Sequence, residues 1–140
     1  MKRLPLSDGQ AREWYAGTLS VVRRRMVPQP TEHVEQIHGI WCEWWYVDRG
    51  DGYVDQDARP LRVPFTTGEI VFIGEAWMGT PDCLSYKISD PRQVIEFGYD
   101  SWRSPITMPA WASRSKARIV SVRPEQEAGV WTWVIEIGRV

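Results

Sequence analysis

The sequence predicts a mainly β (α+β) fold, a small barrel or sandwich of about six to eight short strands with one or two short helices packed beside it. Short runs rich in β-branched and aromatic residues recur along the chain, which is typical of strands. Gly and Pro clusters separate these runs at short intervals. The clearest helix start and stop signals lie near the N-terminus.

The N-terminal part is expected to form a strand, a short helix and a second strand. The first strand covers residues 2–6. Ser7 and Gln10 have the spacing of a capping box, which opens a helix, and Gly17 is the residue expected to end it. The second strand covers residues 20–26, and alternation places its arginines on both faces. This pattern indicates that one face opens on a cleft.

The other strands are expected in the apolar runs of the middle and C-terminal parts. Gly74 marks a bulge or a point of close approach within one of them. The segment 53–64 is expected to be an irregular acidic connection, and 123–129 a polar loop. The predicted strands cover 40–47, 70–77, 83–88, 94–99, 117–122 and 130–137.

A proline-rich segment near position 107 is expected to turn at one edge of the domain. Pro105 and Pro109 fix the turn, because proline restricts its own backbone, and a short helical turn follows over 109–113. Met108 and Trp111 are expected to anchor the segment in the core. Trp102, Arg103 and Arg114 are left to face a ligand.

The composition is that of one ordinary globular domain over residues 1–140. Hydrophobic residues make up 43% and charged residues 25%, and a chain of 140 residues buries a core without metals or disulfides. No run approaches the roughly 18 apolar residues that cross a membrane, and the N-terminus lacks the apolar core of a signal peptide. The two cysteines have no CxxC spacing. We expect a cytoplasmic protein with reduced thiols, no cofactor and no membrane contact.

The charges are distributed unevenly along the chain although the formal net charge is only −1. Residues 1–30 hold six Lys and Arg against two Asp and Glu, and residues 101–140 hold six against three. Residues 31–100 hold five against thirteen. A basic face therefore forms if the two ends meet in the fold, whereas scattered solvated charge is the alternative.

His33 and His38 lie five residues apart in an expected loop, which does not favour a metal site.

Four separated stretches together resemble one family. They are AGTLSVVRRRMVPQP at 16–30, PFTTGEIVFIGEAW at 64–77, YKISD followed by SWRSPITMPAWASR at 86–90 and 101–114, and WTWVIEIGRV at 131–140. In this order and spacing they resemble the ASCH domain family of the PUA-like superfamily, in its phage and prophage-borne branch. The resemblance implies a small PUA-like mixed β-barrel with a cleft beside a helix. It also implies recognition of RNA or modified nucleotides.

This chain has other residues at the positions that are catalytic in some members of that family. Members that hydrolyse acetylated cytidine use a lysine and a threonine where this chain has Leu19 and Val22. The insert that carries their glutamate is reduced here to 124–129. We therefore predict a non-catalytic RNA- or nucleotide-binding module. A divergent modified-nucleoside hydrolase or nuclease using Ser20, Glu75 and Lys87 is one alternative.

The candidate ligand contacts follow from the resemblance and from side-chain chemistry. Arginine forks suit phosphates and stack on bases, although surface ion pairs with the acidic middle, for example with Glu75, are the alternative for Arg23 and Arg24. Trp77 offers a stacking platform with Glu75 beside it; the alternative is a core indole and a carboxylate paired with an arginine. The full set is Ser20, Arg23, Arg24, Glu75, Trp77, Lys87, Trp102, Arg103 and Arg114.

Three tryptophans lie outside the resemblance. Alternation sends Trp41 and Trp45 to one face of their strand and Trp44 to the other, so at least one is expected at the surface or in an interface. Interface hot spots favour Trp, and packing on the core is the alternative.

Because an acidic surface mimics nucleic acid, the other alternative function is a phage-encoded protein that binds and inhibits a host or defence protein. The oligomeric state stays open.

Overall fold

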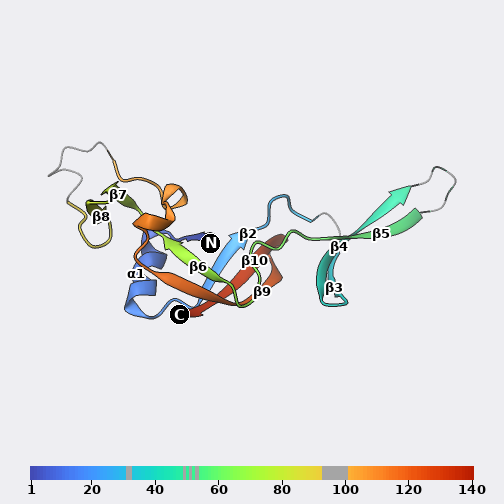
Figure 1. The fold of residues 1–140 in the computed structure, drawn as a ribbon. Helices are drawn as coiled ribbons and strands as arrows, with labels where there is room; N and C mark the ends of the chain where they lie inside the picture. Colours follow the sequence, from blue (N-terminus) through green and yellow to red (C-terminus); the bar gives the residue numbers. More distant parts are fainter. Residues whose placement is uncertain (31–32, 49, 51, 53, 93–100) are drawn as a thin grey trace.

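The fold is mainly β, with mixed sheets and one short α-helix (Figure 1). A computed structural model describes residues 1–30, 33–48, 50, 52, 54–92 and 101–140, without the side chains of 45–48 and 54–56. The described strands form one five-stranded, one three-stranded and one two-stranded sheet. The predicted fold class is confirmed, although no closed barrel is found in the described residues. The predicted strand over 94–99 lies outside them.

The five-stranded sheet is the centre of the domain. Its order is β1 (Arg3–Pro5), β6 (Ile70–Gly74), β9 (Lys116–Glu127), β10 (Val130–Arg139) and β2 (Val21–Arg25). The β1–β6 pair is parallel, and the other pairs are antiparallel. The two ends of the chain therefore meet in one sheet, which brings the basic N- and C-terminal segments together.

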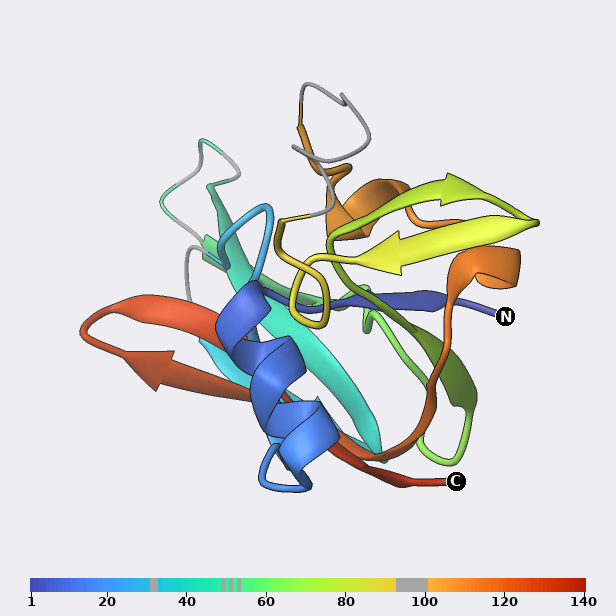
Figure 2. The same cartoon turned by 90° about the vertical axis from the view of Figure 1, so that its left-hand side faces the viewer.

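Helix α1 (Asp8–Ala16) covers one face of this sheet (Figure 2). The capping box is present as predicted, since the Ser7 side chain accepts from the Gln10 backbone and the Gln10 side chain accepts from the Ser7 backbone. Gly17 ends the helix with a φ of 79°, in the left-handed region. Trp14 is fully buried among residues of β1, β2, β6, β9 and β10, so the main core lies between helix and sheet.

A hairpin and two short 3₁₀ helices form a second, smaller cluster. The predicted strand over 70–77 is divided between β6 and β7 (Trp77–Thr80), and β7 pairs with β8 (Cys83–Tyr86). The helices η1 (Pro105–Thr107) and η2 (Ala110–Ala112) lie where the prolines predict a turn. Met108 is buried with Trp77, as predicted. Trp111 is 52% exposed, so its predicted place in the core is wrong.

The three-stranded sheet extends away from the main sheet as an arm over residues 34–60 (Figure 1). It consists of β3 (Val34–Ile37), β4 (Ile40–Asp48) and β5 (Val54–Pro60). The predicted irregular connection over 53–64 is wrong, because β5 pairs along β4. Its polar sequence, VDQDARP, has no strand signal of its own, and β4 supplies the partner for its hydrogen bonds.

The β9–β10 hairpin is longer than the sequence predicts. The expected loop over 123–129 is wrong, because β9 continues to Glu127 and only Ala128 and Gly129 form the turn. Their φ angles are 49° and 80°, as a two-residue type I′ turn requires. The turn sequence Ala-Gly lacks the Asn or Asp that usually indicates this turn.

Gly74 lies at the close approach that the sequence predicts. An added Cβ would meet the Pro105 carbonyl oxygen at 2.6 Å. We expect Gly74→Ala to lower the free energy of unfolding by about 1–3 kcal/mol, because backbone must move to make room. Urea denaturation checks this. Gly9→Ala is the matched control: its Cβ meets nothing within 4 Å, so helix propensity should raise stability by up to about 1 kcal/mol. Equal effects of the two changes would contradict the close approach.

Candidate functional site

The buried Glu75 and the partly exposed Arg114 form an ion pair between the β6–β7 connection and the segment before β9. The Glu75 side chain is 1% exposed. Arg114 donates to both carboxylate oxygens, through Nε at 3.0 Å and Nη2 at 2.8 Å, and the Tyr15 hydroxyl donates to Oε2 at 2.7 Å. The Glu75 oxygens are therefore occupied within the protein. The alternative stated above for Glu75, pairing with an arginine, is the observed arrangement.

The Arg114 guanidinium lies between two tyrosine rings. Its Cζ is 4.4 Å from the Tyr15 ring centroid and 4.2 Å from that of Tyr86, and Nη1 donates to the Ser89 hydroxyl at 2.9 Å. Burial opposes its charge, but the hydrogen bonds and charge of Glu75 outweigh burial and raise the pKa of Arg114. The guanidinium thus connects helix α1, the β6–β7 connection and the residues at and just after the end of β8. Its charge is balanced by Glu75.

Trp77 is a core residue. Its side chain is 2% exposed, and the Arg103 guanidinium covers its ring at 4.9 Å from the centroid. Arg103 also pairs its backbone with that of Trp77. Trp111 contacts Trp77 edge-to-face, with 5.8 Å between ring centroids. The predicted stacking platform is therefore covered at Trp77, and the exposed indole beside it is Trp111.

The remaining predicted contacts are scattered. Arg23 forms exposed ion pairs with Glu125 and Glu127 at 3.8 and 3.7 Å, so it pairs at the surface, but with carboxylates of β9 and not with the acidic middle. Lys87 pairs with Asp8 at 2.8 Å. Ser20 is exposed before β2, and Trp102 is half-buried.

Arg24 lies on the same face of β2 as the buried Val22 and Met26. It donates to the Pro5 carbonyl and lines a small hollow of about 280 Å³ beside Leu6 and Ile106. Burial lowers the pKa of Arg24. Of the two arginines of the predicted pair, Arg24 lines this hollow and Arg23 does not.

The three tryptophans of β4 have different surroundings. Trp41 packs against the main core, while the Trp44 indole donates to Glu35 at 3.0 Å on the arm. The register places Trp45 opposite Asp57, on the face of Trp41; its side chain lies outside the described atoms.

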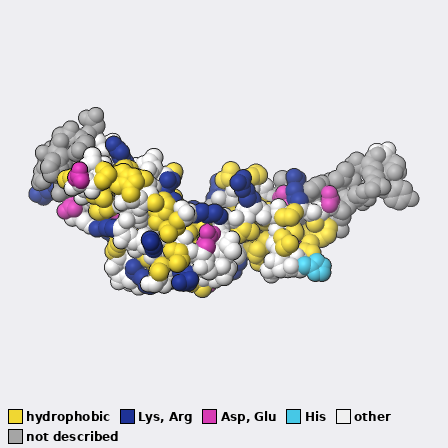
Figure 3. Space-filling model, viewed as in Figure 1, with side chains coloured by type: hydrophobic (Ala, Val, Ile, Leu, Met, Phe, Trp, Pro, Cys, Tyr) yellow, Lys and Arg dark blue, Asp and Glu magenta, His cyan; other side chains and the backbone are white. Residues whose placement is uncertain are grey.

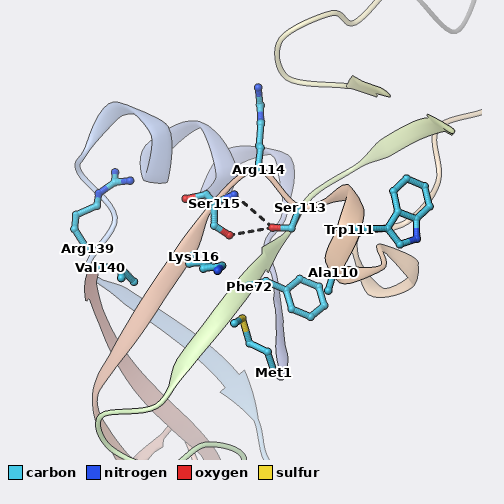
Figure 4. A pocket seen from close by; sticks show the side chains of 10 residues that line it. All are labelled: Met1, Phe72, Ala110, Trp111, Ser113, Arg114, Ser115, Lys116, Arg139 and Val140. Atoms are coloured by element: carbon cyan, nitrogen blue, oxygen red, sulfur yellow. Dashed lines mark hydrogen bonds between the residues drawn. The ribbon is translucent and has the colours of Figure 1, made fainter. Parts of the chain in front are cut away.

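A larger hollow lies where the two ends of the chain meet (Figure 4). It has a volume of about 800 Å³, and we call it the basic hollow. None of the residues that line it is Asp or Glu. The lining residues that matter most for its chemistry are Phe72, Trp111, Arg114, Lys116 and Arg139.

Two cations of the basic hollow are not neutralised by an acidic side chain of the described part. Lys116 is exposed, and its ammonium group forms no hydrogen bond or ion pair with any described residue. Arg139 lies over the Trp14 ring, 3.8 Å from its centroid, and donates through Nη2 to the Trp14 carbonyl. Its other guanidinium N–H groups have no described partner. These two side chains give the hollow its positive charge.

The sheet register explains how the basic hollow forms. Phe72 and Lys116 are opposite each other on β6 and β9, so their side chains share a sheet face. Arg139 is the last residue of β10 and pairs with Ala117. The sequence-based search missed Lys116 and Arg139, although the uneven charge distribution had indicated a basic face at the joined ends.

Comparison with known proteins gives no further assignment. No protein-family model, curated protein or solved structure matches the chain. The resemblance to the ASCH family thus stays a prediction.

Within the described residues, no group of three or more His, Cys, Asp and Glu is arranged to hold a metal ion. Nor does the described part contain a helix with the length and apolar character needed to cross a membrane.

The buried pair predicts a large difference between two arginine truncations. Arg114→Ala should lower the free energy of unfolding by about 3–5 kcal/mol, because it leaves the buried Glu75 carboxylate without its partner. Arg23→Ala removes only exposed ion pairs and should cost at most about 1 kcal/mol. Urea denaturation of both variants checks this. Similar losses in the two variants would contradict a central role for the buried pair.

Tyr15 predicts a loss of stability at alkaline pH. Burial, and then the hydrogen bond to Glu75, raise the pKa of Tyr15 above its usual value. The folded protein therefore keeps this phenol protonated where the unfolded chain ionises it, so stability falls as the pH rises above about 10. Tyr15→Phe should flatten this fall. Urea midpoints of both proteins between pH 8 and 11 provide the measurement, and parallel curves would count against it.

Proposed function

We propose that the protein binds a nucleotide or a short single-stranded RNA segment in the basic hollow, without catalysing a reaction on it. The observation that carries this proposal is a hollow of about 800 Å³ that combines an exposed indole with two cations that have no acidic partner among the described residues, and its lining contains no Asp or Glu. The volume lies within the range of about 300–1,000 Å³ typical of small-molecule sites. Anionic, flat ligands suit this combination.

The base of such a ligand is expected on Trp111. Half of this side chain is exposed, and its contact with Trp77 fixes the ring edge-to-face. A ring held in this way loses little freedom when a base stacks on it. Stacking of bases on aromatic side chains is worth about 1–3 kcal/mol per base and tolerates any sequence.

The phosphate is expected on the opposite side of the hollow. Figure 4 places Arg139 and Trp111 on opposite sides, with Ser113, Ser115 and Lys116 between them. Lys116 supplies an exposed ammonium group, and Arg139 supplies guanidinium donors held over Trp14. A nucleotide would therefore lie across the hollow with its phosphate near these cations.

The chemistry of the lining favours binding over cleavage. It includes neither a carboxylate side chain nor a histidine, which are the usual general bases. The Ser113 hydroxyl hydrogen-bonds to the carbonyls of Ile73 and Ser115, and the Ser115 hydroxyl accepts from the Trp14 indole. The hydroxyl groups of the hollow are thus engaged in the fold.

Mutation of the hollow should weaken binding in a defined pattern. Lys116→Ala should raise the dissociation constants of AMP, UMP and a fluorescent five-nucleotide RNA about tenfold or more, because a charge-assisted contact is lost. Trp111→Ala should weaken binding comparably, and Trp111→Phe should restore most of it, because an aromatic face returns. Calorimetry for the nucleotides and fluorescence anisotropy for the RNA, at low salt, provide the measurements.

Arg118→Ala is the matched control for Lys116→Ala. Arg118 is two residues further along the same strand and exposed, donates to the Gly68 carbonyl and does not line the hollow. Its removal should leave mononucleotide affinity unchanged. Flat titrations of wild-type protein with all three probes at low salt would overturn the proposed function. Equal losses in the Lys116 and Arg118 variants would place binding elsewhere.

A further inference from the structure

The hollow of about 280 Å³ beside helix α1, here called the small hollow, is separate from the basic hollow. It is lined by residues of β1, the start of α1, β2 and η1, and the two hollows share no lining residue. On the face of the molecule shown in Figure 3, hydrophobic side chains lie among Lys and Arg side chains, so neither kind of residue alone marks a site. The small hollow is distinguished by how its polar groups are used.

Arg24 is the only charged residue among those that line the small hollow. It is half-buried and donates to the carbonyls of Pro5 and Arg23. Its Nε–H has no partner among the described residues, and none of their acidic side chains forms an ion pair with it. Burial lowers the pKa of Arg24, whereas the Glu75 carboxylate raises that of Arg114. A half-buried positive charge is therefore left without an anion in the described part of the chain.

The other three polar side chains of the small hollow also have donors left over. Ser7 Oγ accepts from the Gln10 backbone at 3.2 Å, and Gln10 Oε1 accepts from the Ser7 backbone at 3.1 Å. Ser104 Oγ accepts from the Ile106 backbone at 3.3 Å. The fold uses these oxygens as acceptors, while the hydroxyl hydrogens and the Gln10 amide N–H groups have no partner among the described residues. The polar part of the hollow thus offers donors, which suit an anion.

The rest of the small hollow is apolar. This part consists of Pro5, Leu6, Pro105 and Ile106. Leu6 is 1% exposed and Ile106 is 65% exposed, so apolar surface extends from the buried part of the hollow to the solvent. A hydrocarbon group gains free energy when it leaves water for such a surface.

We propose that the small hollow binds a small monocarboxylic acid, with its carboxylate on Arg24 and its hydrocarbon part against Leu6 and Ile106. A carboxylate matches one guanidinium in charge and in the geometry of its two oxygens. A phosphate dianion has one charge more than Arg24 balances, and it leaves the apolar surface unused. The volume of the hollow is close to the lower end of the range of about 300–1,000 Å³ for small-molecule sites. The acid therefore has only a few carbon atoms.

A bound acid would connect three parts of the fold. Its carboxylate would contact β2 through Arg24, the start of α1 through Ser7 and Gln10, and η1 through its N-cap Ser104. Because the ligand binds only the folded chain, it should raise the stability of the protein. This site does not depend on the proposed nucleotide site, since the linings of the two hollows are different.

Titration of the ¹⁵N-labelled full chain, followed by NMR, tests the proposal. Hexanoate should bind saturably with a dissociation constant on the order of 1 mM. The largest shifts should occur at Arg24 Nε–H, at the Gln10 side-chain amide and at the Ser7 backbone. Acetate lacks four methylene groups and should bind at least tenfold more weakly. Hexanol has the same chain length without the charge, and it should also bind at least tenfold more weakly.

Two neighbouring arginines provide the variant and its matched control. Arg24→Met should raise the dissociation constant of hexanoate at least tenfold, because the charge is lost. Arg25→Met should leave it unchanged, since Arg25 is exposed on the opposite face of β2 and does not line the hollow. Ile106→Ala, at an exposed position, should weaken hexanoate binding more than acetate binding, and it tests the apolar half of the site independently of Arg24. Circular dichroism should show that the variants are folded.

Four results would overturn the proposal. The first is the absence of saturable shifts with hexanoate up to about 20 mM. The second is equal affinity for hexanoate and hexanol, because the charge would then play no part. The third is an equal loss of affinity in the Arg24 and Arg25 variants. The fourth is inorganic phosphate that shifts the same residues at lower concentration than hexanoate, since the hollow would then be a phosphate site.

Discussion

The buried pair of Glu75 and Arg114 is the interaction on which the rest of the domain depends. A carboxylate at 1% exposure is stable only with a partner, and Arg114 supplies two hydrogen bonds to it from 39 positions along the chain. Through the two tyrosines and Ser89, the same guanidinium fixes helix α1 and the end of β8. Arg114 also stands two residues before Lys116, so the pair sets where the chain enters β9 and where that lysine lies. The Glu75–Arg114 contact therefore helps to position the basic hollow, although neither residue is proposed to bind the ligand.

This arrangement separates structural cations from those left to bind a ligand. Arg114 is balanced by Glu75, and Arg23 by the carboxylates of β9. A second anion would gain little from either, because each guanidinium already has an opposite charge. Lys116 and Arg139 have no acidic partner in the described residues, and both line the basic hollow because β9 and β10 are neighbouring strands. A local positive site therefore exists although the formal net charge of the chain is −1. Where charges are paired matters more than their sum.

The sequence was informative wherever a local signal decides the structure, and failed where a distant partner does. The capping box at Ser7, the stop at Gly17 and the tight site at Gly74 depend on neighbouring residues or on backbone space, and each was predicted. Strand β5 and the outer half of β9 are polar, and their pairing partners alone define them. Trp111 was misplaced because a 3₁₀ turn after a proline gives no periodicity from which its buried side is evident. For Glu75 the sequence offered both alternatives, and only the fold shows which arginine reaches it.

Two of the stretches that resemble a family are explained by their packing against each other in this fold. GEAW and WASR contact each other in space, through Glu75 with Arg114 and through Trp77 with Trp111. A chain needs both stretches together to form this packing, whether or not it binds anything. These contacts explain why this chain has both stretches, and they do not depend on any ligand. The groups proposed to hold a nucleotide are others: the exposed Trp111 indole, and Lys116 and Arg139, which have no acidic partner among the described residues. A functional resemblance would have to appear at Trp111, Lys116 and Arg139, not at the buried pair.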